Sequence, residues 1–148
     1  TFLIDSLSSW TELPLTEAKV NMGTGCYRVN FTLPNLKADN WMLDLGDVRE
    51  SARIRINGQE IGTLWSVPFT AMVGKNLKAG NNLLEVEVTN LPANRIADYD
   101  RRKVDWRIFK EINMVDLNYK KVDYGSWSIV PSGLLGPVKL IPMNNRAK

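Results

Sequence analysis

Apolar and polar residues alternate in three separate stretches of this chain, and the alternation predicts how it folds. Successive side chains of a β-strand point to opposite faces of its sheet, so a period of two indicates strands with one buried face. Seven apolar side chains in these stretches are predicted to point inward: Tyr27, Val29, Phe31, Ile54, Ile56, Val86 and Val88.

Turn signals connect the predicted strands. Asn57 and Gly58 supply the positive φ angles that a two-residue hairpin turn requires, and Ile61 to Leu64 is the returning strand. Further short strands are predicted over 41–45, 69–73 and 138–141, the last after a turn-rich stretch at 131–137. Short strands without alternating helices favour an all-β fold, an antiparallel β-sandwich of the jelly-roll type.

The pattern changes at Asn94. From there to about residue 132 the periodicity is lost, charged and aromatic residues are mixed, and 106–115 is predicted to carry a helical turn or two. The chain is therefore predicted to consist of three parts: an N-terminal arm at 1–24, a β-sandwich domain at 25–142 and a C-terminal tail at 143–148.

Composition narrows the classes of partner. The 148 residues are 44% hydrophobic and 24% charged, as in an ordinary globular domain, and the net charge is only +3. The densest basic run, at 101–103, is too short for a nucleic-acid surface, so neither nucleic acid nor membrane is an expected partner. The first residues carry no basic leader and no long apolar stretch, so no signal peptide is expected.

The residues available for chemistry argue against catalysis and metal binding. The chain has no histidine and a single cysteine, Cys26, which is predicted to be a half-buried filler of its strand. Asp98 and Asp100 have the only spacing that suggests calcium, but two ligands do not make a site, and Asp98 alternatively caps a turn. No spacing selects a catalytic pair among the later carboxylates. We therefore predict no catalytic residue, metal or cofactor.

Aromatic and polar residues gather in the irregular segment. Sugar rings stack on aromatic side chains while their hydroxyls bond to amide, carboxylate and guanidinium groups. The candidate carbohydrate-binding residues are Asn94, Arg95, Asp98, Tyr99, Asp100, Trp106, Tyr124 and Trp127. The alternative is that these aromatic rings close one edge of the sandwich or pack on a neighbouring domain. Trp10, Trp41 and Trp65 are assigned to packing within the domain.

Several motifs, in order along the chain, resemble the sugar-binding β-sandwich domains of multidomain glycoside hydrolases of the family-two type. They are Gly25-Cys26-Tyr27-Arg28 with Phe31, Leu43-Asp44-Leu45-Gly46, Asn57-Gly58 with Gly62, Trp65 to Phe69, Leu77 to Val86, Asn94-Arg95, and Ser132 to Val138. The resemblance covers about residues 9 to 142 and is closest to the C-terminal sandwich of large α-L-rhamnosidases.

The resemblance implies a galactose-binding-like jelly roll. In that family the catalytic carboxylates lie in a separate barrel domain, so the chain is expected to be a noncatalytic accessory domain whose partners are the parent enzyme's catalytic domain and a glycan. The resemblance also implies a secreted or periplasmic parent. Two alternatives stay open: an autonomous carbohydrate-binding module, and an interdomain or protein–protein adaptor without sugar affinity.

Overall fold

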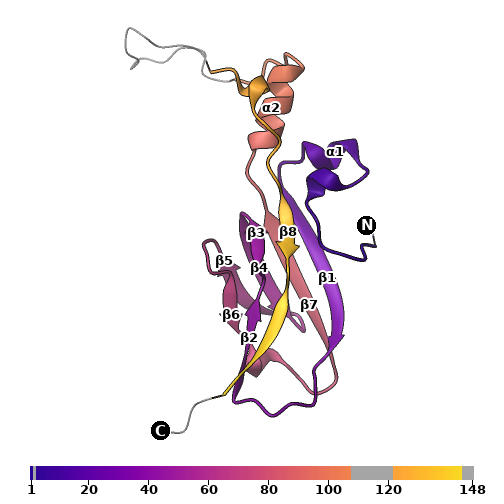
Figure 1. Ribbon diagram of the computed structural model, residues 1–148, viewed down its shortest axis with the longest axis vertical. Coiled ribbons are helices and arrows are strands. Elements are labelled where there is room, and N and C mark those ends of the chain that lie inside the picture. The colour runs from indigo at the N-terminus through magenta and orange to yellow at the C-terminus, as the bar shows by residue number, and fades with distance from the viewer. Residues whose placement is uncertain (2, 108–121, 145–148) are drawn as a thin grey trace, which may run out of the picture.

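Two antiparallel sheets pack face to face in the computed structural model, which describes residues 1, 3–107 and 122–144 (Figure 1). The strands of the described residues are β1 (Thr24–Thr32), β2 (Asn40–Asp44), β3 (Asp47–Arg49), β4 (Ser51–Ile56), β5 (Gln59–Leu64), β6 (Thr70–Met72), β7 (Asn81–Thr89), β8 (Gly133–Gly136) and β9 (Lys139–Met143). The helices are α1 (Thr16–Lys19) and α2 (Ala93–Arg101), with 3-10 turns η1 (Trp10–Glu12), η2 (Gly74–Asn76) and η3 (Tyr124–Ser126).

The strand order confirms the predicted fold class. One sheet has four strands in the order β1-β7-β4-β5, and the other has three in the order β6-β2-β9. The pair β3-β8 extends the second sheet, because β2 leads into β3 and β8 leads into β9 with only two residues between them. Every one of these pairings is antiparallel. Within the described residues, neither helix has the length and apolar character needed to cross a membrane.

The core lies between the two sheets, where the alternating pattern placed it. The side chains of Ile54, Ile56, Val86 and Val88 are at most 1% exposed, so their inward orientation is confirmed. Tyr27 and Phe31 are half-buried and pack against the same core. The second sheet contributes Trp41, Leu43 and Leu45.

Strand β1 differs from the prediction at two positions. Val29 was expected to be buried but is 52% exposed. The strand is the edge of the four-stranded sheet, and the facing sheet has only three strands, so the edge is incompletely covered. Cys26 was expected to be half-buried but is exposed, because it alternates with Tyr27 and so points to the solvent face.

The predicted hairpin is present between β4 and β5. Asn57 and Gly58 have φ angles of 53° and 79°, the conformation of a type I′ turn. The Asn57 amide nitrogen donates hydrogen bonds to the Asn76 carbonyl at 3.0 Å and to Asn82 Oδ1 at 2.9 Å. Asn57 Oδ1 accepts from the Leu83 amide at 3.1 Å. The turn is therefore fixed to β7 by its own side chain.

The N-terminal arm, expected to be irregular, contains η1 and α1 and is attached to the sandwich through Trp10. The Trp10 indole, 7% exposed, donates a 2.5 Å hydrogen bond to the Tyr27 hydroxyl. The backbone amide of Leu134 donates to the same hydroxyl at 3.0 Å. One phenol oxygen therefore joins the arm, β1 and β8.

Replacing Tyr27 with phenylalanine is expected to lower the free energy of unfolding by about 1–3 kcal/mol. The change leaves two donors at buried residues, Trp10 and Leu134, without their acceptor. Urea denaturation measures the loss. The matched control is Tyr99→Phe, since no described residue bonds to the Tyr99 hydroxyl, and a loss of equal size in the control would contradict the explanation.

Helix α2 was not expected. Its residues were predicted to be irregular because the apolar–polar periodicity is lost from Asn94 onward. The structure gives the reason for that loss, since the helix buries no stripe of aliphatic side chains. Its buried positions are Asn94 and Ala97, at 3% and 2% exposure. The helical turn predicted over 106–115 lies mostly outside the described residues, and Trp106 and Arg107 are not helical.

Strand β8 occupies a stretch that was predicted to be turn-rich. Its two glycines, Gly133 and Gly136, have φ angles of 103° and 71°, which explains why the composition resembled a turn. At Gly133 an added Cβ would collide with the side chains of Trp10 and Tyr27. The glycine therefore allows β8 to run close to the attachment of the arm.

Candidate functional site

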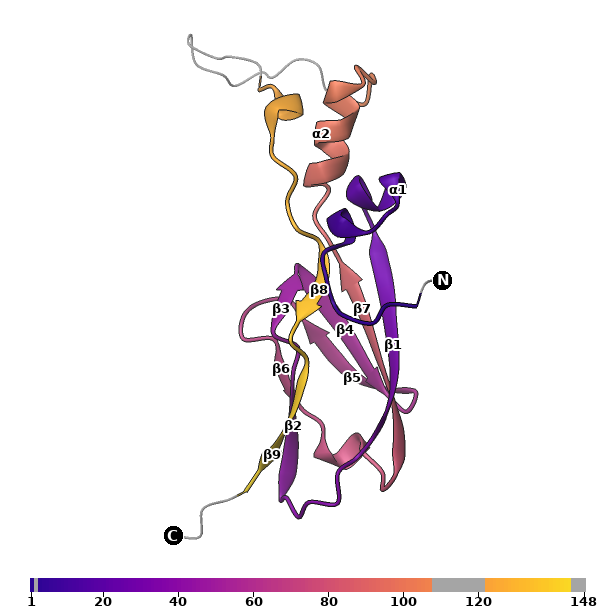
Figure 2. The ribbon, with the colours of Figure 1, turned by 45° about the vertical axis from the view of Figure 1, so that its right-hand side comes forward.

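The candidate binding residues lie at one end of the molecule, beyond the sandwich, where α2 packs against η3 (Figures 1 and 2). We call this unit, formed by 93–107 and 122–130, the apex. Asn94 attaches its base: the side-chain amide donates to the Val130 carbonyl at 2.8 Å and accepts from the Val130 amide at 2.9 Å. The Asn94 side chain thus makes the two hydrogen bonds to Val130 that a residue of a neighbouring β-strand would make. Its nitrogen and its oxygen both have a partner.

Asp100 is the centre of the apex. Its carboxylate accepts hydrogen bonds from the Trp106 indole at 2.8 Å, from Arg107 at 3.0 Å and from the Tyr124 backbone amide at 3.2 Å. The indole bond is the largest cause that holds the pKa of Asp100 below its usual value, and it acts with the other two donors against the effect of burial. Asp100 is therefore a fixed anion that joins the two segments of the apex, 93–107 and 122–130.

Three aromatic rings of the apex, those of Tyr99, Trp106 and Tyr124, have arginine side chains beside them. The Arg107 guanidinium lies 5.3 Å from the Trp106 ring centroid and 5.1 Å from that of Tyr124. Tyr99 is contacted by Arg95 and Arg102, each at 5.6 Å. These are cation–π distances, so the rings already have stacking partners within the domain.

Trp127 is the exception. Its ring meets Tyr124 edge-on, with centroids 4.7 Å apart and planes at 74°, and the residue is 41% exposed. Trp106 and Tyr124 are half-buried. Of the candidate rings in the described apex, Trp127 therefore has the most surface to offer a ligand.

A hollow of about 490 Å³ lies beside this cluster. Its lining is mostly charged, with Trp106 as the aromatic wall: Asp100, Lys103, Val104, Asp105, Trp106, Arg107, Val122 and Asp123. Polar groups beside an indole have the chemistry that recognises a sugar.

The structure gathers four of the eight candidates, Asp100, Trp106, Tyr124 and Trp127, into one cluster. The other four lie on α2. Asp98 does not cap a turn, as its alternative interpretation held, because it lies inside the helix and pairs with Arg102 at 2.7 Å. No group of three or more ligating side chains that could hold a metal ion occurs in the described part of the chain.

Three arginines of the apex were missed by sequence reasoning. Arg101 donates to the Gly125 carbonyl at 2.9 Å and to the Trp127 carbonyl at 2.5 Å, and so holds the backbone that carries the exposed ring. Arg102 and Arg107 form the ion pairs and ring contacts given above. Their spacing held one usable signal, since Asp98 and Arg102 are four residues apart, as in a helical ion pair.

The assignment of tryptophans to packing is correct for two residues and wrong for one. Trp10 and Trp41 are 7% and 6% exposed, as expected. Trp65 is 79% exposed, the highest value of any aromatic side chain in the described residues. Phe69, 7% exposed, takes the inward position of this loop, and its carbonyl accepts from the Leu45 amide at 2.9 Å. The ring of Phe69 takes the place in the core that this loop fills, and the ring of Trp65 is left in solvent.

The contacts that hold the apex together are expected to depend on pH. Because the folded pKa of Asp100 lies below its unfolded value of about 3.9, its contacts stabilise the apex above that pH and are lost as pH falls through the folded pKa. The indole N–H resonance of Trp106 should therefore shift toward its solvent-exposed position only as the pH falls through the lowered pKa of Asp100 in the folded protein. In the Asp100→Asn variant the shift should be absent. If Asp123→Asn abolished it instead, the assignment to Asp100 would be wrong.

Comparisons with known proteins agree with this architecture. Residues 13–132 match the model of the family described as "Glycosyl hydrolase 2 galactose-binding domain-like". A protein of Formosa agariphila named "Putative beta-glucuronidase" is 34% identical over 92% of this chain, but the chain spans only 13% of that protein's length.

Solved structures give the same result. A rhamnosidase from Novosphingobium sp. PP1Y superposes with a TM-score of 0.72 and 26% identity, over 93% of this chain and 12% of its own. A beta-glucuronidase from an uncultured Clostridium species gives a TM-score of 0.53 with 32% identity, over 57% of this chain and 15% of its own. Since the family model matches most of the chain, the chain belongs to the galactose-binding-like domains of glycosyl hydrolase family 2.

Proposed function

We propose that this chain acts as a noncatalytic accessory domain within a multidomain glycoside hydrolase. The observation that carries the proposal is the family match over 13–132, combined with the 13% and 12% shares of the glucuronidase and the rhamnosidase that the chain spans. In such an assembly, most of the polypeptide lies in other domains. The expected partner is the catalytic domain of the same polypeptide.

Two carboxylates of the domain, Glu87 and Asp100, are unsuited to act as a general acid. A glycosidase needs a carboxylic acid whose pKa is raised, so that it can protonate the leaving group. The pKa values of Glu87 and Asp100 are instead lowered, Glu87 by hydrogen bonds from Arg53 and Arg55 and Asp100 chiefly by the Trp106 indole. Both are held as anions, which is the state of a structural ion pair and not of a general acid.

Hydrolysis assays test this role. The isolated chain, incubated with aryl β-glucuronide and aryl α-L-rhamnoside, is expected to release no aryl alcohol above the blank. Release that disappears when one carboxylate within 98–123 is changed to its amide would overturn the proposal.

Glycan contact at the apex is a second candidate function, and the exposed ring of Trp127 together with the charged hollow lined by Trp106 favours it. Calorimetry against a glycan panel tests it. If a glycan binds, Trp127→Ala and Trp106→Ala are each expected to weaken binding by about 1–3 kcal/mol, the usual range for an aromatic anchor. Trp65→Ala is the matched control because it removes an exposed indole away from the apex.

The three outcomes separate the remaining alternatives. Weakening by the apex variants alone supports sugar binding there. Weakening by Trp65→Ala alone would overturn the apex as the sugar site. Absence of heat with every glycan favours an adaptor without sugar affinity, in which the apex aromatic rings serve only to hold the apex together.

A further inference from the structure

The outer faces of the two sheets differ sharply in chemistry. The outer face of β1-β7-β4-β5 is covered by ion pairs, with Arg28 on Glu85 at 2.8 Å, Arg55 on Glu87 at 2.8 Å, and Arg53 also on Glu87. An antiparallel sheet that faces water carries such a polar surface. This face of the sandwich therefore has the chemistry of a surface exposed to water.

A row of apolar side chains crosses the outer face of β6-β2-β9, between polar outward positions at Asn40 on one side and Asp44, Thr70 and Lys139 on the other. Met42 pairs directly with Met72 on one side and with Ile141 on the other, so three apolar side chains form a row across the sheet. Their neighbours Trp41, Leu43, Ala71 and Leu140 belong to the core, which directs the row outward. Met143 continues it along β9, and Met72 and Met143 are 47% and 38% exposed. We call these four residues the methionine face.

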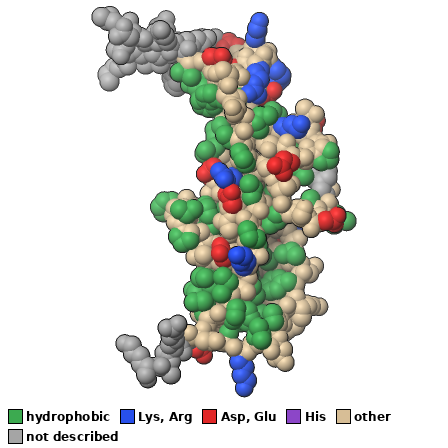
Figure 3. Space-filling view, in the orientation of Figure 1, with side chains coloured by type: hydrophobic (Ala, Val, Ile, Leu, Met, Phe, Trp, Pro, Cys, Tyr) green, Lys and Arg blue, Asp and Glu red, His purple; other side chains and the backbone are tan. Residues whose placement is uncertain are grey.

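Figure 3 shows apolar side chains gathered over β2 and β9 in the lower half of the view. Lys139 and Asp44, which are paired in register, bound the methionine face at one end. Flexible, polarisable methionines at a surface are typical of contacts that adapt to a partner.

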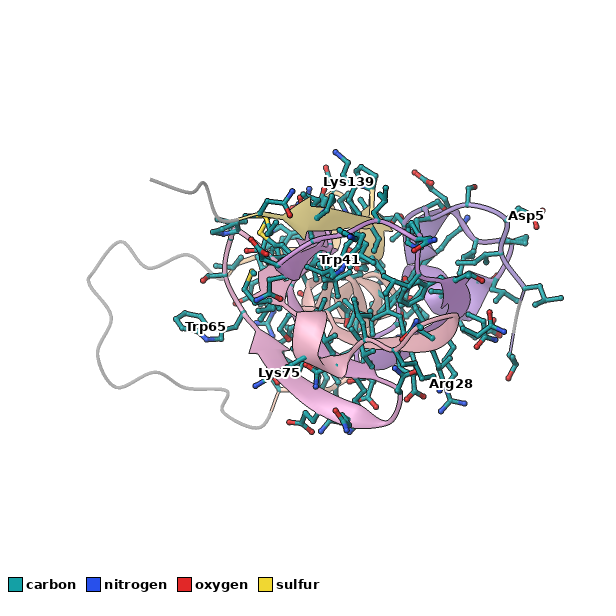
Figure 4. The ribbon with its side chains drawn as sticks, turned by 90° about the horizontal axis from the view of Figure 1, so that it is seen from below. Asp5, Arg28, Trp41, Trp65, Lys75 and Lys139 are labelled. Atoms are coloured by element: carbon teal, nitrogen blue, oxygen red, sulfur yellow. The ribbon has the colours of Figure 1, made fainter. Side chains whose placement is uncertain are left out.

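The loop between β5 and β6, which leads directly into the strand that carries Met72, adds two exposed apolar side chains. Trp65 and Val67 are each 79% exposed, and Figure 4 shows Trp65 directed away from the body of the sandwich, whereas Trp41 lies within it. The loop is anchored directly behind them, because Phe69 is buried and the Thr70 amide donates to the Pro68 carbonyl at 2.9 Å. A loop whose backbone is held in place before binding loses little backbone entropy on docking.

We propose that the methionine face, with Trp65 and Val67, docks against a neighbouring folded domain of the same polypeptide. The inference rests on the proposed accessory role. Most of each relative's length lies outside the region this chain matches, so a neighbouring domain is tethered to it at high effective concentration. Trp65 is the anchor of the contact, since tryptophan is enriched among residues that dominate interface energy.

The area of the surface favours a tethered domain over a second copy of this chain. The six side chains expose on the order of 600 Å². Stable complexes between free molecules bury about 800 Å² per partner, so this surface lies at the lower limit of their range. Interfaces between domains of one chain bury roughly 600–1,500 Å² in total, about 300–750 Å² per side, so the surface lies well inside that range.

The chemistry also favours a protein over a glycan. Bound sugars need hydrogen-bonding side chains around the aromatic ring. The exposed neighbours of Trp65 are Ser66, Val67 and Pro68, and the sheet beside the loop presents methionine. An apolar pocket on a protein surface matches this set.

The experiment compares each variant in two contexts: the isolated chain and the full-length gene product. In the isolated chain, Trp65→Ala and Met72→Ser should leave the melting temperature almost unchanged, because both side chains are exposed. In the full-length product, each should raise the rate of proteolytic cleavage between this domain and its neighbour by about tenfold, the effect of losing one interface anchor. Trp127→Ala, a matched removal of an exposed indole at the apex, should not change that rate.

Several results would overturn the docking surface. They are equal effects of Trp65→Ala in both contexts, concentration-dependent dimers of the isolated chain that Trp65→Ala abolishes, and a glycan affinity that depends on Trp65. Failure of the accessory role has a different readout, namely a full-length product with no further folded domain or hydrolysis by the isolated chain. Protection of the backbone amides of 65–67 from hydrogen exchange only in the full-length product would support the docking surface independently of any substitution.

Discussion

Gly46→Ala is expected to lower the free energy of unfolding by about 3 kcal/mol or more. Gly46 connects β2 to β3 and has a φ angle of +66°. A Cβ there would lie 2.5 Å from the Gly136 carbonyl carbon, 2.6 Å from its oxygen and 2.8 Å from the Pro137 nitrogen. All three are backbone atoms of the neighbouring crossing from β8 to β9, so no side-chain rotation relieves the collision, and the two sheet segments must separate.

Gly58→Ala is the matched control. Gly58 also has a positive φ, +79°, but no atom lies within 4 Å of its added Cβ. It should therefore cost only the conformational strain of an alanine in this region, about 1 kcal/mol. Denaturant unfolding of both variants isolates the steric contribution as the difference between them. Equal losses would mean that the close approach at Gly136 is not a constraint of the fold.

Ile54→Ala is expected to cost about 2–5 kcal/mol, because it leaves a cavity at the centre of the sandwich. Ile54 is fully buried, and its strand β4 is hydrogen-bonded on both sides, to β5 and β7. Few neighbouring atoms can therefore move to fill the space. Ile129→Ala makes the same chemical change at a residue that is 50% exposed, and its loss should stay below about 1 kcal/mol. A cavity effect is ruled out if the two variants unfold at the same denaturant concentration.

The central strands could be predicted from the sequence because each has a hydrogen-bonded neighbour on both sides and one face covered by the other sheet. Residues such as Ile54 and Val86 lie on strands with partners on both sides and a sheet above them, so the alternation of apolar and polar residues translates directly into burial. Val29 follows the same pattern on the edge strand, where that translation fails. Alternation indicates which face a residue occupies, whereas burial also depends on how wide the opposite layer is.

Helix α2 and the loop at Trp65 could not be predicted for a different physical reason. The helix is held by Asn94 against the backbone of Val130, a polar contact between residues far apart in the sequence. The loop contains two aromatic residues, Trp65 and Phe69, but the core has room for only one of their rings. Hydrophobicity alone does not determine whether Trp65 or Phe69 occupies it.

The candidate site was predicted in outline, since the aromatic and charged residues of 94–127 that the structure describes do meet at the apex. The availability of their ring faces was not predicted. Sugar stacking and guanidinium stacking need the same flat surface, and the positions of Arg95, Arg102 and Arg107 against these rings follow only from the folded chain.

The hydrogen bonds of Asn57 bear on the chemical lifetime of the protein. An asparagine followed by glycine deamidates readily, because the glycine nitrogen attacks the side-chain amide carbon to form a succinimide. In the hairpin that amide is held by the Asn76 carbonyl, by Asn82 Oδ1 and by the Leu83 amide, which restrains it from reaching Gly58. Conversion to aspartate would also place a carboxylate oxygen against two oxygen acceptors where a donor now lies. Ageing at this position therefore proceeds chiefly through molecules whose hairpin has opened, and each stabilising contact of the sandwich also slows the accumulation of isoaspartate.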